Sequence, residues 1–325
     1  MAIGSAEGIN MIIDKRIEQK RSVHKKSFLK KVYEQRYLLL LVAPGLIYYF
    51  IFKYISMYGV IIAFKNYNFI DGISGSPWVG FKYFEEFFKS QYFVRLIRNT
   101  FTISATDLVF SFPVPLIFAL LLNELKSNKL KKLTQTVSYL PYFLSTVVVI
   151  GILKQLISPY NGVINAMRNA FGHESINFLM EKEYFVPLYV LTGIWQGMGY
   201  NAIVYLATLS GIDPALYEAA QIDGAGRMRC VWNITLPSLL PTISILLILR
   251  LGHLLDVGYE KIILMYNPGI YETADVISTY VYRMGIQNAN YSFSTAVGLM
   301  NSVVSLVLIV VANKISNKLS STGLW

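Results

Sequence analysis

Six apolar runs alternate with polar segments along the chain, and each is long enough to cross about 30 Å of hydrocarbon. They cover residues 37–63, 99–122, 135–157, 186–209, 239–258 and 292–313. Several contain proline, which a membrane helix tolerates where neighbouring helices satisfy the freed carbonyl groups. The pattern predicts an all-α integral membrane protein built as a kinked bundle of six transmembrane helices.

A polar loop between the fourth and fifth runs reads DPALYEAAQIDGAGRMRCVWNITLP (213–237). Asp213 is a suitable N-cap, and the proline after it suits the first helical position. The helix is expected to end at Asp223-Gly224, where glycine can adopt the left-handed conformation. A second short helix should run from Ala225 until Leu236-Pro237 turns the chain back into the membrane.

The first of these helices is too short to be stable alone in water, so it needs a surface to pack against. Leu216, Ala219 and Ala220 share one face, and small alanine side chains allow another backbone to approach closely. Glu218 and Asp223 are available for polar contacts at the edge of this face. Docking into a groove of a soluble partner and packing within the chain as a simple connector both remain open at this point.

Lysine and arginine placement sets the orientation of the bundle. The first 36 residues, the two loops at 123–133 and 210–238, and the last segment share one side of a six-span topology and hold 17 of these residues, against nine in the opposite loops. The positive-inside rule therefore predicts that both termini are cytoplasmic.

This topology divides the chain into five parts. Residues 1–36 form a basic cytoplasmic segment without a signal-peptide cleavage site, so the first span is expected to be retained. The others are the first transmembrane helix (37–63), an extracytoplasmic loop (64–98), a five-helix core that includes the loop 210–238 (99–313), and a cytoplasmic tail (314–325).

Composition agrees with a membrane protein and narrows its chemistry. Of 325 residues, 54% are hydrophobic and only 15% are charged, which is too apolar for an ordinary soluble domain. The formal charge of +10 follows from the orientation bias, and no nucleic-acid-binding motif accompanies it. The single cysteine, Cys230, excludes an internal disulfide and a thiol cluster for a metal.

Ionisable residues within a span are costly and suggest function. Arg250, His253 and Asp256 are spaced i, i+3, i+6 in the fifth run, on one arc of a helix. They can line a water-filled path, and Arg250 can bind a carboxylate, such as that of a uronate, through two hydrogen bonds. The alternative is an Arg–Asp pair that holds helices together. Asp107 in the second run can either pair internally or line the path.

The fourth run carries Gln196, Tyr200 and Asn201, a mixture of amide and aromatic groups that suits sugars. Helix packing is the competing explanation, because Gly193 and Gly197 form a small-xxx-small pair that lets another helix approach.

The segment EAAQIDGAGRMRCVWNITLP resembles the EAA motif of permease subunits in binding-protein-dependent ABC importers. Val231 departs from the phenylalanine of many relatives, and Trp232 beside it can fill the same space. The residues that match are Glu218, Ala219, Ala220, Asp223, Gly224, Ala225, Ile234, Leu236 and Pro237.

Further segments, among them YLLLLVAPGLIYYFIF (37–52) and LKKLTQTVSYLPYFLSTVVV (130–149), resemble the carbohydrate branch of these permeases. Within it, they are most similar to the permeases that import oligosaccharides such as the acidic, uronate-containing fragments of alginate. The resemblance implies a type I importer fold in the bacterial inner membrane, with the first helix wrapped around a five-helix core. It also implies a soluble extracytoplasmic binding protein and a second, non-identical permease.

In such importers a coupling helix, here the EAA helix, docks onto an ATP-binding subunit that holds ATP and Mg. This chain has no phosphate-binding loop of its own. It is therefore expected to be a transport subunit that is not an enzyme, with no cofactor, catalytic residue or metal site.

Two other classes of protein are alternatives to the importer interpretation. A secondary carrier or channel would also use intramembrane Arg, His and Asp, but a carrier should show paired broken helices in repeated halves, and no such repeat is visible. A membrane enzyme needs a catalytic constellation, and three histidines without an HExxH motif or clustered carboxylates supply none.

Overall fold

The computed structural model describes residues 33–320, with side chains through residue 318. This part of the chain is built from helices, and its only β-pairing is an isolated bridge between Lys65 and Trp78. The all-α prediction is confirmed. Most of the predicted basic segment, through residue 32, and residues 321–325 of the predicted tail lie outside the described residues.

The chain forms two compact units, divided after Val60. The described part of the first contains α3 (Arg36–Tyr49), with Pro44 inside it, and the π-helix η1 (Phe50–Ile55). None of the side chains in these two helices is buried. A helix that is apolar all round suits a lipid bilayer rather than water.

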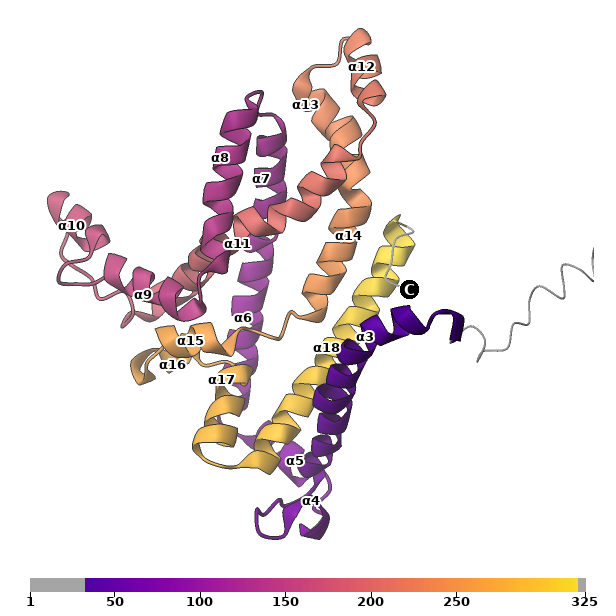
Figure 1. Cartoon of the computed structure of the whole chain (residues 1–325). Coiled ribbons are helices and arrows are strands. Elements are labelled where there is room, and N and C mark those ends of the chain that lie inside the picture. Colours follow the sequence, from indigo (N-terminus) through magenta and orange to yellow (C-terminus); the bar gives the residue numbers. More distant parts are fainter. Residues whose placement is uncertain (1–32, 321–325) are drawn as a thin grey trace, which may run out of the picture. The chain divides into compact units, whose positions relative to one another are not determined.

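The second unit begins in the 3-10 helix η2 (Tyr58–Phe64) and contains the rest of the fold (Figure 1). Its elements are α4 (Gly72–Gly75), α5 (Lys82–Lys89), α6 (Phe93–Ser111), α7 (Pro113–Asn123), α8 (Asn128–Tyr139), η3 (Leu140–Phe143), α9 (Thr146–Leu156), α10 (Val163–Ala170), α11 (Lys182–Ser210), α12 (Pro214–Ile222), α13 (Arg227–Cys230), η4 (Val231–Thr235), α14 (Leu236–Gly252), α15 (Tyr259–Met265), η5 (Pro268–Ile270), α16 (Tyr271–Ala274), α17 (Ile277–Tyr282), η6 (Arg283–Gln287) and α18 (Tyr291–Ser320).

Four helical stretches of the described chain are long and apolar enough to cross a membrane, and a fifth is added if one bent pair counts as a span. Helix α11 coincides with the predicted fourth span but is not among them. It has 29 residues, so its length is sufficient, and its many tyrosine, amide and glycine residues make it less apolar. The four are Arg36–Phe64, Phe93–Asn123, Arg227–Gly252 and Tyr291–Lys318.

The predicted third span, 135–157, is not one straight helix. The chain bends by 103° between the stretch that ends at Phe143 and α9. Pro141 lies in the 3-10 turn η3, and Ser145 begins a new helix by accepting a hydrogen bond from the N–H of Val148. A proline followed by a fresh N-cap ends one helix and starts another, which the apolar run alone does not reveal.

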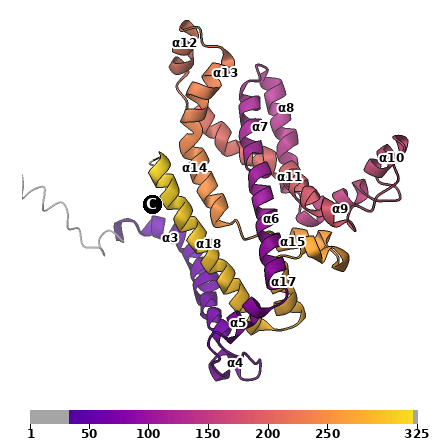
Figure 2. The same ribbon diagram turned by 180° about the vertical axis from the view of Figure 1, so that it is seen from behind.

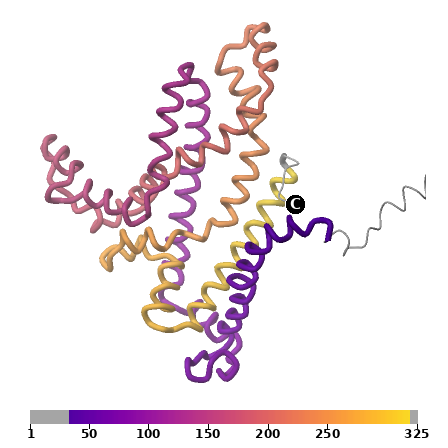
Figure 3. Tube along the Cα trace, viewed as in Figure 1, coloured from indigo at the N-terminus to yellow at the C-terminus, as the bar shows by residue number. Residues whose placement is uncertain are grey.

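The predicted fifth span, 239–258, is wrong at both ends. Helix continues from Arg227 through Pro237 to Gly252 as one stretch. The π-turn η4 ends two residues before Pro237, which lies in the first turn of α14, where a missing N–H is tolerated. At the other end α14 stops at Gly252. Arg250 is therefore helical, whereas His253 is the C-cap and Asp256 lies in the non-helical connection to α15, which Figure 3 traces.

Helix α11 is central to the second unit and contacts α6, α7, α8 and α14 along its length. Buried apolar clusters flank it, one with α9 and α15 and another with α7 and α14. Helix α18 packs against α14 and α17. Figures 1 and 2 show the α7–α8 turn and α12 at the same end of this unit, as the predicted topology requires.

A buried ion cluster ties α6 to the segment 271–287. The Asp275 side chain is fully buried and accepts two hydrogen bonds from Arg283, of 3.1 and 2.7 Å, and one of 3.1 Å from Arg95 of α6. The hydroxyl of Thr279 donates another, at 3.0 Å. Two guanidinium groups thus share one carboxylate, which compensates its loss of water.

Candidate functional site

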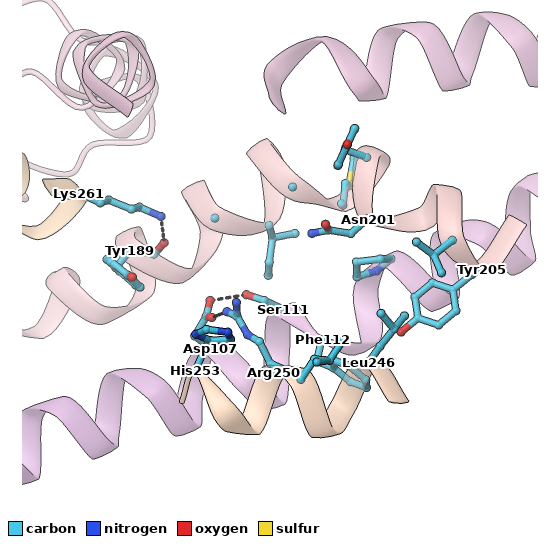
Figure 4. A pocket seen from close by; sticks show the side chains of 18 residues that line it. Asp107, Ser111, Phe112, Tyr189, Asn201, Tyr205, Leu246, Arg250, His253 and Lys261 are labelled. Carbon is cyan, nitrogen blue, oxygen red and sulfur yellow. Dashed lines mark hydrogen bonds and ion pairs between the residues drawn. The ribbon is translucent and has the colours of Figure 1, made fainter. Parts of the chain in front are cut away.

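A cavity of about 570 Å³ lies along α11 and is closed by residues of α6, α7, α14 and α15 (Figure 4). Its volume is in the range of small-molecule sites. The lining is apolar toward Leu246 and polar toward Asp107. Asp107, Ser111, Phe112, Pro115, Tyr189, Gly193, Ile194, Gly197, Met198, Tyr200, Asn201, Val204, Tyr205, Leu246, Leu249, Arg250, His253 and Lys261 line it.

An ion pair between α6 and α14 forms the polar wall of the cavity. Arg250 donates a hydrogen bond to one carboxylate oxygen of Asp107, and Ser111 donates to the other at 2.7 Å. The Asp107 side chain is 14% exposed and that of Arg250 is 50% exposed. The Arg–Asp pairing weighed from the sequence therefore exists, with Asp107 in place of Asp256, and the charge of Arg250 is already balanced.

The cavity brings together four of the six residues predicted for a substrate path: Tyr200, Asn201, Arg250 and His253. Tyr200 also stacks on Tyr142, with ring centroids 3.7 Å apart. Its ring position is thus fixed by the bend in the third span.

The other two predicted residues lie elsewhere. The Gln196 amide donates a 3.1 Å hydrogen bond to the carbonyl of Leu144, at the end of η3, and does not line the cavity. Asp256 lines a smaller neighbouring cavity of about 150 Å³, and one of its carboxylate oxygens lies 4.0 Å from Nδ1 of His253. The side chains of His253 and Asp256 are largely exposed, because α14 ends before these two residues.

Gly193 and Gly197 face the cavity rather than a close helix neighbour. A Cβ atom on Gly193 would lie 3.3 Å from Nζ of Lys261 and 3.8 Å from a carboxylate oxygen of Asp107. One on Gly197 would lie 3.0 Å from the Asn201 amide nitrogen. The two glycines therefore widen the cavity beside its polar groups.

Lys261 is the cavity residue that the sequence analysis did not select, because it lies between the fifth and sixth apolar runs, outside the predicted spans. It lies on α15, and its ammonium donates a 2.6 Å hydrogen bond to the carbonyl of Tyr189 and sits 4.3 Å from the centre of that ring. The signal in the sequence was a lysine within the apolar stretch YEKIILM, because a charged side chain among apolar ones suggests a functional role.

The loop 213–237 has the bend that the sequence predicted. Asp213 caps α12 by accepting from the N–H of Ala215 at 2.9 Å, and Gly224 has a φ of +77°. The N–H of Ala225 bonds to the carbonyl of Ala220, and that of Gly224 to Gln221. These two bonds form a Schellman motif, which ends the helix at a left-handed glycine.

Helix α12 buries none of its side chains against the described part of the chain. Leu216 is exposed, and so are Ile222, at 87%, and Met228, at 70%. One hydrogen bond of 3.0 Å between the hydroxyls of Tyr217 and Thr235 links α12 to the beginning of the following span. The hairpin thus presents apolar side chains to solvent while remaining attached to α14 through η4.

Two solved structures are similar to the whole described fold. One is the crystal structure of a bacterial ABC transporter involved in the import of the acidic polysaccharide alginate, with a TM-score of 0.83 and 44% identity over 90% of this chain and 99% of the other. The second is the bacterial alginate ABC transporter in complex with an alginate pentasaccharide-bound periplasmic protein. Its TM-score is 0.84, at 44% identity over 91% of this chain and 99% of that chain.

Relatives of similar sequence come from Bacillus subtilis (strain 168). The polygalacturonan/rhamnogalacturonan transport system permease protein YteP is 41% identical over 100% of this chain and 99% of its own length. Protein LplB is 45% identical over 92% and 94%, respectively. The family model for the inner membrane component of binding-protein-dependent transport systems matches residues 106–321. The chain therefore belongs to the family of inner membrane permease components of binding-protein-dependent transport systems.

Proposed function

We propose that this chain is one of two permease subunits of an ATP-driven importer for oligosaccharides, including acidic, uronate-containing ones such as alginate fragments. One observation carries the proposal: the likeness to the alginate importer extends over nine-tenths of the chain, at 44% identity. The relative that transports polygalacturonan and rhamnogalacturonan supports an acidic substrate as well.

The cavity along α11 is the proposed substrate path. Tyr200 offers an aromatic face to the C–H surface of a sugar and Asn201 offers an amide to its hydroxyls, while Arg250 and His253 belong to the polar side of the path. Gln196 is assigned a supporting role, since it holds the end of η3 in place. Asp256 belongs to the adjoining small cavity, where a substrate would pass next to the ion pair.

The hairpin around α12 is the proposed coupling element. Its exposed apolar face fits a groove on a separate ATP-binding subunit, which would bind ATP and Mg and perform hydrolysis. Glu218, Ala219 and Ala220 lie on the docking helix, and Asp223, Gly224 and Ala225 form its bend. Ile234, Leu236 and Pro237 belong to the continuous helix that would transmit the movement to the span.

In the bacterial inner membrane, α12 and the basic α7–α8 turn would face the cytoplasm, together with both termini. A soluble binding protein would deliver the oligosaccharide to the opposite side. Resemblance to the carbohydrate branch favours a second permease that differs from this chain. The two halves of the path would then carry different side chains.

Gentle purification of the tagged chain from its native membrane tests the proposal. Mass spectrometry should identify an ATP-binding subunit and a second permease, and the purified complex should hydrolyse ATP faster with a loaded binding protein. Recovery of the chain alone, under conditions that preserve a known importer complex, would instead favour a secondary carrier.

A further inference from the structure

Lys261 is a charged group without a carboxylate partner in the described part of the chain. The one carboxylate of the 570 Å³ cavity, Asp107, is bound by Arg250 and Ser111. The Lys261 ammonium has three donors, of which one is used by the Tyr189 carbonyl at 2.6 Å. Removing an ammonium from water is costly unless other groups satisfy it, so two unused donors beside a cavity indicate a missing acceptor.

The space next to this ammonium is kept open by a glycine. Gly193 lies between Lys261 and Asp107, and a Cβ there would be 3.3 Å from Nζ of Lys261. An alanine methyl would therefore occupy the position that a bound group needs to reach the ammonium. The glycine is not required by backbone geometry, because it lies within the regular helix α11.

The charges of the lining favour an anion at this point. Asp107 and Arg250 balance each other, so Lys261 leaves the polar end of the cavity with one net positive charge. Figure 4 shows Lys261 and the Asp107–Arg250 pair on the same end of the cavity, with Tyr189 beside them. The Tyr189 ring, 4.3 Å from the ammonium, holds its position through a cation–π contact.

We propose that Lys261, with Gly193 beside it, forms a subsite that binds the carboxylate of a uronate residue and gives the permease its preference for acidic oligosaccharides. The proposal rests on the import function described above and deepens it. Arg250, which the sequence suggested for this task, instead forms an ion pair with Asp107, so this carboxylate does not neutralise Lys261. The carboxylate would receive a charge-assisted hydrogen bond from Nζ in the space over Gly193.

The experiment uses the complete importer reconstituted in proteoliposomes with its binding protein. Uptake of a uronate oligosaccharide is compared with that of its carboxyl-reduced, neutral counterpart of the same length and linkage. The binding protein is the same throughout, so changes in the uptake ratio come from the permease. Lys261→Met should lower the acidic-to-neutral ratio about tenfold, the effect of about 1.4 kcal/mol, whereas Lys261→Arg should retain most of it.

Gly193→Ala tests the same subsite without changing any charge. It should also lower the ratio, because its methyl blocks access to Nζ. Gly151→Ala is the matched control, since this helical glycine has nothing within 4 Å of an added Cβ, and it should leave the ratio unchanged.

An unchanged ratio in assembled Lys261→Met complexes would overturn the subsite. If that variant fails to assemble, the Gly193→Ala ratio decides in its place, and an unchanged value rejects the subsite. Failure of the proposed function has a different signature, because the unaltered importer would then take up neither oligosaccharide.

Discussion

The ammonium group of Lys261 contacts the backbone carbonyl oxygen and the ring face of Tyr189 in place of water. Burial lowers the pKa of Lys261 to about 8, and the nearby Asp107 charge opposes this shift only in part. The side chain is therefore charged below pH 8 and loses its charge as the pH rises through that value. An ordinary lysine would stay charged to about pH 10.

The uptake preference for uronate oligosaccharides should accordingly fall between pH 7 and pH 9. The other ionisable and charged groups at this polar end of the cavity are Asp107 of α6, Tyr189 of α11, and Arg250 and His253 at the end of α14. Measuring the acidic-to-neutral uptake ratio across this range isolates the lysine if Lys261→Arg is run in parallel, because a guanidinium stays charged. A decline of equal size in the arginine variant would assign the pH effect to another group.

The individual residues of the cavity show what a sequence can reveal about a site. Spacing within the fourth and fifth runs selected Tyr200, Asn201, Arg250 and His253, which line the cavity, together with Gln196 and Asp256, which do not. It did not reveal that Arg250 pairs with Asp107, 143 positions away in the sequence. Such a pairing depends on how α6 and α14 meet, and periodicity within one helix carries no information about its neighbours.

Among the elements, the α12 hairpin follows most directly from local sequence. Its cap, its length and its left-handed glycine are all set by interactions within a few residues, so they could be predicted. The ends of α9 and α14 could not. Their apolar runs continue past the breaks at Ser145 and Gly252, because a membrane environment selects for apolar residues regardless of where a helix stops.

Gly224 should be essential to the shape of this hairpin. A left-handed conformation costs a residue with a side chain roughly 1 kcal/mol or more, although an added Cβ would meet no atom within 4 Å. Gly224→Val is therefore expected to reduce transport-coupled ATP hydrolysis by deforming the bend, while Gly224→Asn, which tolerates this conformation, should be mild.

Gly226 provides the control for this prediction. It too has open space around an added Cβ, but its φ is −74°, which any residue adopts. Gly226→Val should therefore leave coupling close to normal. Coupled uptake that is equally normal in Gly224→Val would show that the bend tolerates strain and does not set the docking geometry.

On the scale of the whole molecule, the Asp275 cluster connects parts of the chain that are 180 residues apart, from Arg95 to Asp275. Asp275→Asn would leave two guanidinium groups facing each other without an anion. Loss of one partner of a buried ion pair costs about 3–5 kcal/mol, and partial exposure of both arginines reduces this figure. We expect a clearly lower midpoint of thermal unfolding for the detergent-solubilised importer.

The exposed pair between Lys182 and Glu272 is the comparison for that measurement. Both side chains are open to solvent, so Glu272→Gln should change the unfolding midpoint little. Equal stability of the two variants would mean that the cluster does not hold α6 against the segment 271–287.

Cys230, 8% exposed at the foot of the α12 hairpin, is the only cysteine in the chain. A buried thiol reacts slowly with labelling reagents. The native permease should therefore take up little label and add little background signal in site-directed spectroscopy. A pair of spin labels, one introduced at exposed Arg229 of α13 and one at exposed Lys129 of α8, would report the movement of the hairpin relative to α8 through the ATP cycle without altering the docking helix.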